Sequence, residues 1–222
     1  MTENYGIGRL KKRKRNLEFL MARSTARAAA AKREQILEAA ILRFGRQSYE
    51  DTSLRAIAAD VGIDVAHVHR SFGSKELLFA EAVRATTRPE RFLGGPPGLL
   101  AAKLSDEILV RQAMHDNDEV GPLDILMRSL SSREASRILH DSTLTDFVEP
   151  ISKMTYPSSA RRALMIAAVL LGIGVLREVL GIEPLLDTED GEIQQLTIQL
   201  LKVLIGERPY DVAARAAEGD DR

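Results

Sequence analysis

The stretch from Ser53 to Phe72 predicts two short helices joined by a tight turn, and it constrains the fold more than any other feature of the chain. In the first helix apolar residues recur at helical spacing, so one face can be buried. These residues are Leu54, Ile57, Ala58 and Val61. Gly62 can end this helix because glycine takes the left-handed conformation without strain, and Asp64 can cap the next. The pattern is that of a helix-turn-helix.

The second helix presents a small and basic outer face. At roughly 100° per residue, its inward side holds Val65, Val68 and Phe72. The opposite side holds Ala66, His67 and Arg70, and His69 lies beside the buried stripe. Such a face suits a recognition helix, whose first residues meet base edges in the major groove of DNA. An ordinary helical hairpin with a polar surface has the same pattern, so spacing alone leaves both interpretations open.

Three motifs follow one another in register around this stretch. They are RxxILxAAxxxF at Arg33 to Phe44, TSLRAIAADVGI at Thr52 to Ile63, and FGSKELL at Phe72 to Leu78. Their combination resembles the N-terminal domain of the TetR family of transcriptional repressors, and it is more specific than a helix-turn-helix alone. Three positions depart from the family pattern: Ser48 replaces a glycine, His69 a tyrosine that touches a phosphate, and Ser71 a frequent histidine. These departures concern backbone contacts to DNA rather than the fold.

The resemblance implies an all-α protein that binds double-stranded DNA through this region. Arg55 occupies a position from which relatives reach DNA, and Lys75 matches a lysine that meets a phosphate. A cation in the first turn of a helix is unfavourable to the helix dipole, which makes sense if Lys75 binds a phosphate. A solvated surface lysine is the alternative. The residues expected to contact DNA are Thr52, Ser53, Arg55, Asp64, Val65, Ala66, His67, His69, Arg70 and Lys75.

Charge is divided unevenly along the chain. Residues 1–88 carry 17 Lys and Arg against 10 Asp and Glu, whereas residues 89–222 carry 14 against 22. A basic N-terminal part on an acidic remainder is expected when only one end of a protein meets a polyanion. With 45% hydrophobic and only 5% aromatic residues the composition favours an all-α globular protein. The absence of cysteine excludes disulfides and thiolate metal sites.

We expect four parts in the chain. Residues 1–24 form a basic arm whose run from Arg9 to Arg15 has too little apolar material to fold by itself. Residues 25–88 form the DNA-binding domain, which begins with a helix from about Thr25 to Arg46. Pro89 and the GGPPG of residues 94–98 then break the helical pattern. Residues 89–210 form an α-helical ligand-binding and dimerisation domain, and residues 211–222 form a tail.

The basic arm is open to three interpretations. It can lie along phosphates or in the minor groove of DNA, it can serve only to solubilise the protein, or translation can start at Met21. No signal peptide is predicted, because only short apolar pieces follow the basic run. We therefore expect a cytoplasmic protein.

Two C-terminal helices are expected, at about Ser159 to Leu180 and Glu192 to Ile205. The centre of the first is apolar on every side but shorter than the roughly 20 residues that cross a bilayer. Such a helix must be buried on every side. One chain of this size has too few other segments to cover both C-terminal helices. We therefore expect a homodimer that binds a palindromic operator and has no membrane contact. The expected interface residues are Leu164, Ala168, Leu171, Val175, Leu196, Leu200, Val203 and Leu204.

The resemblance also implies that a small apolar molecule of unknown identity relieves repression. Candidate pocket residues are Met114, Met127, Phe147, Met154, Tyr156 and Met165, although methionine and aromatic residues at helical spacing also form plain core. A DNA-binding dimer without any ligand is the first alternative. No catalytic motif is found, so we expect neither an enzyme nor a cofactor. A metal-dependent all-α protein is a second alternative, which would use His115, Asp116, Asp118 and Glu119.

Overall fold

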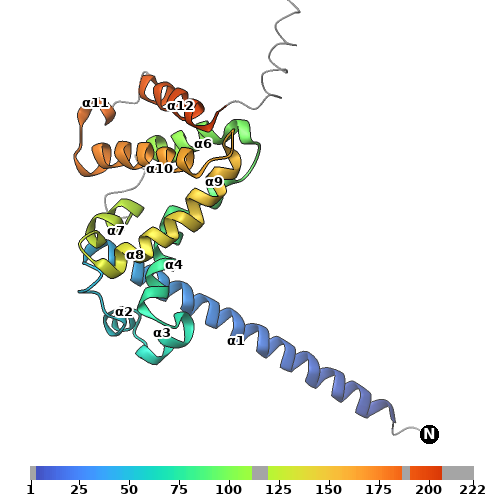
Figure 1. Ribbon diagram of the computed structural model, residues 1–222. Helices are drawn as coiled ribbons and strands as arrows, with labels where there is room; N and C mark the ends of the chain where they lie inside the picture. The colour runs from blue at the N-terminus through green and yellow to red at the C-terminus, as the bar shows by residue number, and fades with distance from the viewer. Residues whose placement is uncertain (1–3, 112–119, 187–190, 207–222) are drawn as a thin grey trace, which may run out of the picture.

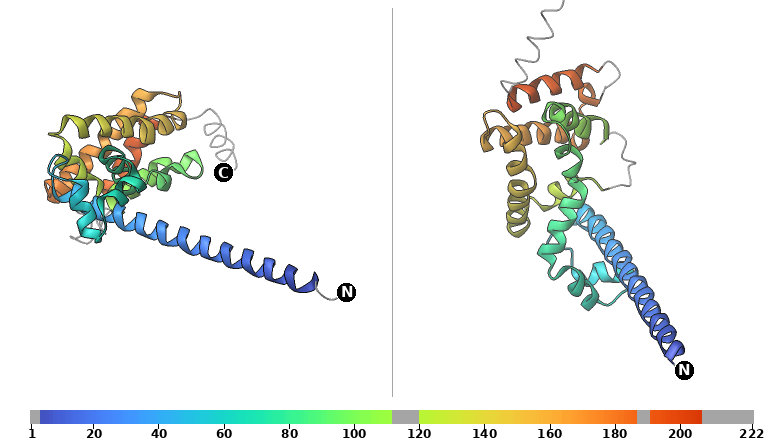
Figure 2. Two further views of the ribbon diagram at one scale, coloured as in Figure 1. Left: turned by 90° about the horizontal axis from the view of Figure 1, so that it is seen from below. Right: turned by 90° about the vertical axis from the view of Figure 1, so that its right-hand side faces the viewer.

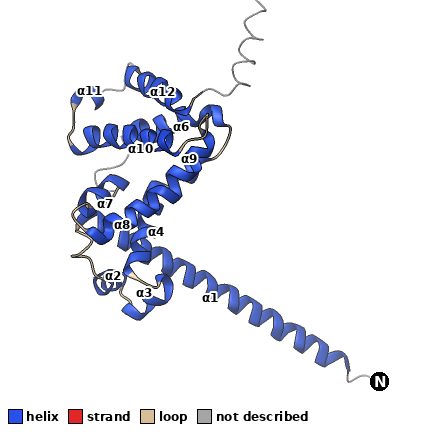
Figure 3. Ribbon diagram, in the orientation of Figure 1, coloured by secondary structure: helices blue, strands red, loops and turns tan. Residues whose placement is uncertain are grey.

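The computed structural model describes residues 4–111, 120–186 and 191–206 of the chain. Helices and the loops between them make up these ranges, and no strand occurs in them (Figure 3). The prediction of an all-α fold is therefore confirmed. Within the described ranges, none of the helices has both the length and the apolar character needed to cross a membrane.

Helix α1 (Asn4–Arg46) extends far beyond the rest of the molecule (Figures 1 and 2). We expected this helix to begin near Thr25 after an irregular arm, and that expectation is corrected, because the basic run lies within the helix. The physical reason is composition. Between Gly8 and Gly45 the chain has neither glycine nor proline, and it is rich in Ala, Lys and Arg, which have high helix propensity. Once the packed C-terminal part of α1 forms, extension adds one hydrogen bond per residue without a new nucleus.

The next two helices begin and end where the sequence predicted, and the helix after them has Lys75 in its first turn, as expected. They are α2 (Leu54–Val61), α3 (Val65–Phe72) and α4 (Lys75–Thr87). Gly62 closes α2 with φ of 67°, in the left-handed region that other residues rarely adopt. The helix-turn-helix prediction is confirmed in its boundaries.

A first hydrophobic core joins these helices to a later part of the chain. Its centre is an aromatic cluster, in which the ring of Phe79 lies edge-on to Phe44 at 4.9 Å and to Tyr49 at 5.0 Å between centroids. Helices α7 (Pro122–Ser129) and α8 (Arg133–Ser142) contribute Ile125 and Ala135 to the same core. The packing of the DNA-binding helices thus extends past the break at Pro89.

A second core lies at the other end of the molecule. It is built from α5 (Glu90–Leu93), α6 (Leu100–Asp106), α9 (Glu149–Met154), α10 (Ala160–Gly174) and α12 (Glu192–Ile205). The two C-terminal helices begin where we predicted, with Ser159 capping α10. The short elements η1 (Pro97–Leu99) and α11 (Glu183–Leu186) were not expected.

The described residues of this later part include three segments of π-helix, namely η2 (Glu107–Arg111), η4 (Thr143–Val148) and η5 (Val175–Val179). Segment η4 connects α8 to α9 without a break, so residues 133–154 form one helical path. This path contributes Leu139 to the first core and Ile151 to the second. It is therefore a direct mechanical link between the two cores.

The aromatic cluster gives a test of the first core. Phe79 is fully buried, so Phe79→Ala should leave a cavity and lower the free energy of unfolding by about 3–5 kcal/mol. Leu77→Ala is the matched control, because Leu77 belongs to the same helix and is 61% exposed. Urea denaturation followed by circular dichroism measures both. Equal stability losses in the two variants would contradict the packing described here.

Candidate nucleic-acid interface

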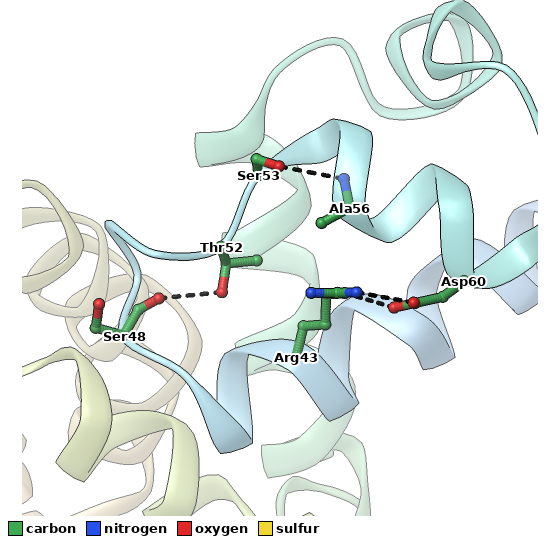
Figure 4. A network of polar contacts seen from close by, with 6 residues as sticks. All are labelled: Arg43, Ser48, Thr52, Ser53, Ala56 and Asp60. Atoms are coloured by element: carbon green, nitrogen blue, oxygen red, sulfur yellow. Dashed lines mark hydrogen bonds and ion pairs between the residues drawn. The ribbon is translucent and has the colours of Figure 1, made fainter.

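Side-chain caps fix the geometry of the helix-turn-helix. The Ser53 hydroxyl accepts a hydrogen bond from the Ala56 amide at 3.1 Å (Figure 4), and the Asp64 carboxylate accepts one from Ala66 at 2.7 Å. Ser74 caps α4 in the same way by accepting from Leu77. Each cap satisfies an amide that the helix itself leaves unpaired. The caps thus fix where α2, α3 and α4 begin.

Two bidentate ion pairs tie the long helix α1 to the DNA-binding helices. Arg43 donates to both carboxylate oxygens of Asp60 in α2, at 2.5 and 2.8 Å (Figure 4). The Arg43 guanidinium holds the pKa of Asp60 below its usual value. Arg33 donates to Glu81 in α4 at 2.6 and 2.5 Å, and its guanidinium lies over the ring of Phe72. These pairs position α2 and α4 on α1, and sequence reasoning missed them, because no local spacing connects residues so far apart in the chain.

The outer face of α3 brings Ala66, His67 and Arg70 together, as its angular positions predicted. Ala66 and Arg70 are exposed, while Val68 and Phe72 are buried below them. A nitrogen of the Arg70 guanidinium lies 3.2 Å from Nδ1 of His67, so the two side chains form one polar surface. His69 is also exposed, but its Nδ1 lies 3.0 Å from the Gly73 carbonyl. That contact uses part of its capacity to bind a phosphate.

Among the other residues predicted to contact DNA, Thr52 differs from the expectation. Its side chain is fully buried and its hydroxyl donates to the Ser48 carbonyl at 3.0 Å (Figure 4). A buried side chain cannot reach a duplex, so Thr52 acts by holding the loop before α2. Ser53, Arg55 and Asp64 are exposed, and Val65 is half-buried.

Lys75 lies in the first turn of α4, as predicted, but its side chain turns inward. Its ammonium group lies 4.1 Å from the centroid of the Tyr49 ring, and the residue is half-buried. Burial lowers the pKa of Lys75, whereas the carboxylates of Glu50, Glu134 and other neighbours act in the opposite direction. Binding a phosphate therefore requires the ammonium group to leave the ring of Tyr49.

A row of exposed apolar side chains marks the second predicted interface, on α10 and α12. Leu164, Leu171 and Leu200 are 41–46% exposed, and Leu196 and Val203 are 53% and 73% exposed. Ala168 is exposed as well, whereas Val175 and Leu204 are half-buried, with Leu204 packed on the second core. Burial on every side, which we expected for these helices, is thus not reached within one chain.

The structure does not bring the candidate pocket residues together. Phe147 and Met154 pack against the second core, and Met127 is half-buried in α7. Tyr156 and Met165 are 43% and 54% exposed, so they lie at the surface rather than in an internal cavity. Met114 falls outside the described residues. A cleft of about 660 Å³ lies instead between α1 and α2, over Leu42 and Arg46.

The residues of the alternative metal site, from His115 to Glu119, also fall outside the described residues. In the ranges that the structure does describe, no three His, Asp or Glu side chains are arranged to hold a metal ion.

Comparison with known proteins connects the two ends of the chain to one family. Residues 36–82 match the family profile described as bacterial regulatory proteins, tetR family. Residues 107–205 match the profile described as tetracyclin repressor-like, C-terminal domain. No curated protein sequence matches this chain significantly.

Solved structures share the fold at low sequence identity. NalD, the secondary repressor of the MexAB-OprM multidrug efflux pump in Pseudomonas aeruginosa, aligns with a TM-score of 0.57 and 20% identity. The alignment covers 79% of this chain and 97% of NalD. A TetR-family regulator from Streptomyces coelicolor A3 aligns with a TM-score of 0.52 and 20% identity, over 79% of this chain and 95% of its own.

The matched families consist of transcriptional regulators rather than enzymes. The two profile matches together span most of the chain, and the capped helix-turn-helix lies within the first of them. The protein therefore belongs to the TetR family of DNA-binding transcriptional regulators.

Proposed function

We propose that this regulator is a homodimeric repressor that binds a palindromic operator and is released from it by a small apolar ligand. The observation that carries the proposal is that one chain has two separate surfaces, each suited to a different partner. One is the polar face of α3, where the exposed Arg70 lies beside the half-buried His67. The other is the apolar row on α10 and α12.

The DNA-binding part of the proposal rests on the capped helices. The outer face of α3 would enter the major groove, with Arg70 and His67 at the base edges. Arg55, exposed at the start of α2, would reach the duplex beside it. These side chains supply the donors that recognise the acceptors of a guanine in the major groove.

Helix α1 adds a basic extension at the same end of the molecule. It runs past α3 on the side away from α10 and α12 (Figures 1 and 2). Residues 4–33 contain ten Lys and Arg and one acidic residue, Glu18. We assign this segment to the phosphates that flank the half-site, because such charge binds a polyanion without reading its sequence.

The assembly part of the proposal follows from exposed apolar surface. Large contiguous apolar patches are rare on monomers and mark interfaces. The exposed apolar residues of this surface recur at spacings of three or four residues along each helix, as in helices that pack against one another. Two copies of this pair form a four-helix interface, which also brings together two recognition helices related by a two-fold axis.

The ligand part of the proposal rests on the family match and on the shared fold. NalD, which shares the fold, is named as a repressor of a multidrug efflux pump, and the family match over residues 107–205 includes the part of the second core that α9, α10 and α12 contribute. A ligand that enters beside Phe147 and Met154 can release DNA only by favouring a different spacing of the recognition helices. Helix α4 is the element proposed to transmit this change, since it leads from Lys75 toward that core. A DNA-binding dimer without a ligand is the alternative.

The first prediction concerns direct contacts. Arg70→Ala and Arg55→Ala should each cost about 1–3 kcal/mol of binding free energy and relax specificity at one base pair, if each reads a base. Lys75→Ala should instead weaken binding to all sequences alike. It should also make the slope of log affinity against log salt concentration shallower by about one. Fluorescence anisotropy on a duplex selected from a random pool measures these effects. Arg161→Ala, an exposed arginine of α10, is the control. Unchanged affinity in all three variants would refute the assignment.

The second prediction concerns assembly. Leu171→Arg or Leu200→Arg would place an unpaired charge in the proposed interface and should give monomers or aggregates. Leu130→Arg is the control, because Leu130 is 54% exposed just after α7, outside this surface. Sedimentation velocity at micromolar concentration distinguishes the species. In the wild-type dimer the recognition helices should lie about 34–36 Å apart, or at a multiple of that spacing. A well-folded wild-type monomer would count against the interface.

The third prediction separates the ligand-responsive repressor from the dimer without a ligand. A ligand selective for the folded protein should raise the thermal midpoint in a screen of small apolar compounds. Calorimetric titration of such a ligand should then give a weaker affinity in the presence of operator, by the factor that the ligand weakens DNA binding. Equal affinities in both titrations would leave a DNA-binding dimer with no switch.

A further inference from the structure

The last turn of α12 is attached to the segment that joins α9 to α10. An α-helix leaves its final four carbonyl groups without partners inside the helix. In α12 the first of these, on Lys202, accepts from the Gly206 amide at 2.9 Å. The last of them, on Ile205, accepts from the Tyr156 amide at 2.6 Å. Main-chain donors thus pair two of the four groups.

The other two carbonyl groups of this turn accept from one arginine side chain. Nη1 of Arg162, in the first turn of α10, lies 3.2 Å from the Val203 oxygen and 3.0 Å from the Leu204 oxygen. A cation at the C-terminal end of a helix is also favourable to the helix dipole. Arg162 therefore connects the start of α10 to the end of α12, the helix that packs on it (Figure 1).

The position of Arg162 is not explained by the stability of α10 itself. A cation in the first turn of a helix is unfavourable to the dipole of that helix, and α10 has no acidic residue in its first turn. The start of α10 is already capped by the Ser159 hydroxyl, which accepts from the Arg162 amide at 3.4 Å. We therefore attribute the arginine side chain to its contact with α12.

Gly206 allows the main chain to pass close to this contact. Its φ is 82°, in a region that other residues rarely adopt. A Cβ atom at this position would overlap the Tyr156 carbonyl oxygen and lie 3.2 Å from Nη1 of Arg162. Tyr156, Arg162 and Gly206 thus surround the last turn of α12, and we call these three residues the α12 clamp.

The clamp holds one of the two helices that carry the exposed apolar row. Leu200 and Val203 of α12 belong to this row, and Val203 is its most exposed member at 73%. The Val203 carbonyl is itself a partner of Arg162. At the other end of α12, the Gln194 amide group donates to the Asp106 carboxylate of α6 at 2.8 Å. Both ends of α12 are therefore held in place within a single chain.

We propose that Arg162 is a positioning residue for dimerisation, which holds α12 on α10 in the arrangement that a second copy of the chain binds. The inference rests on the proposed homodimer and adds the contact that prepares its surface. Because the clamp fixes the last turn of α12, Leu200 and Val203 have a defined place relative to Leu164 of α10. A second copy then meets a surface that is already ordered.

Loss of the clamp would transfer the cost of this order from folding to association. Without Arg162 two carbonyl groups at the end of α12 lose their partners, and the last turn can fray toward water in the monomer. Association then has to order the turn in both subunits. Ordering costs of the usual size, counted twice, correspond to a dimer that is about ten- to hundredfold weaker.

Sedimentation velocity on a dilution series of the full chain tests the proposal. Arg162→Met keeps the apolar stem and removes both hydrogen bonds, so it should raise the dimer dissociation constant by about ten- to hundredfold. Arg162→Lys keeps a cation that can donate to the same carbonyl groups and should recover most of the affinity. Gly206→Ala disturbs the clamp from its other side and should weaken the dimer as well.

Lys202→Met is the matched control. Lys202 is an exposed cation in the same turn of α12, and its side chain supplies none of the donors of the clamp. Its replacement should leave the dimer dissociation constant unchanged. Far-ultraviolet circular dichroism checks that each variant is folded, and Gly206→Ala provides the measurement if Arg162→Met is not.

The outcomes separate this role from that of an ordinary stabilising contact. If Arg162→Met lowers the thermal midpoint but leaves the dimer dissociation constant unchanged, Arg162 only stabilises the fold and the inference is overturned while the dimer stands. The same holds if Arg162→Lys is as weak as Arg162→Met, or if Lys202→Met weakens the dimer equally. If the wild-type protein is monomeric at micromolar concentration, the proposed homodimer and this inference both fail.

Discussion

The structure depends on the burial of one aromatic cluster that no single part of the chain can enclose. Phe44, Tyr49 and Phe79 come from α1, the following loop and α4, and their remaining sides are covered by α7 and α8. A segment as small as residues 32–88 buries a low fraction of its surface, so it gains stability from added helices. The DNA-binding helices are therefore built onto the later part of the chain rather than linked to it by a tether.

This shared core has a consequence for regulation. A rigid link between the two ends needs elements that reach both, and the path from α8 through η4 to α9 does so with Leu139 in one core and Ile151 in the other. Its middle is π-helical, a form that is rare and is often found at functional sites. Two further π segments pack near α10 or end it, so the irregular helical geometry is concentrated where a ligand is proposed to act.

Much of the candidate site could be predicted, because it depends on contacts between residues that are close together in the sequence. Ser53, Asp64 and Ser74 are caps whose partners lie two or three residues away, and Gly62 supplies a backbone conformation that glycine alone adopts easily. The faces of α3 follow from its angular period. The inward turn of Lys75 onto Tyr49, and the burial of Thr52, could not be predicted in this way, since both depend on contacts across the fold.

By itself the sequence determined the all-α class, the limits of α2, α3, α4 and α12, and the resemblance to one family, because helix periodicity, capping and motif spacing act over a few residues. Only the tertiary structure decided that α7 and α8 complete the first core, that Arg43 and Asp60 join α1 to α2, and that Lys75 lies over the ring of Tyr49. Such contacts join residues far apart in the chain, and their formation depends on how whole helices pack rather than on any local pattern.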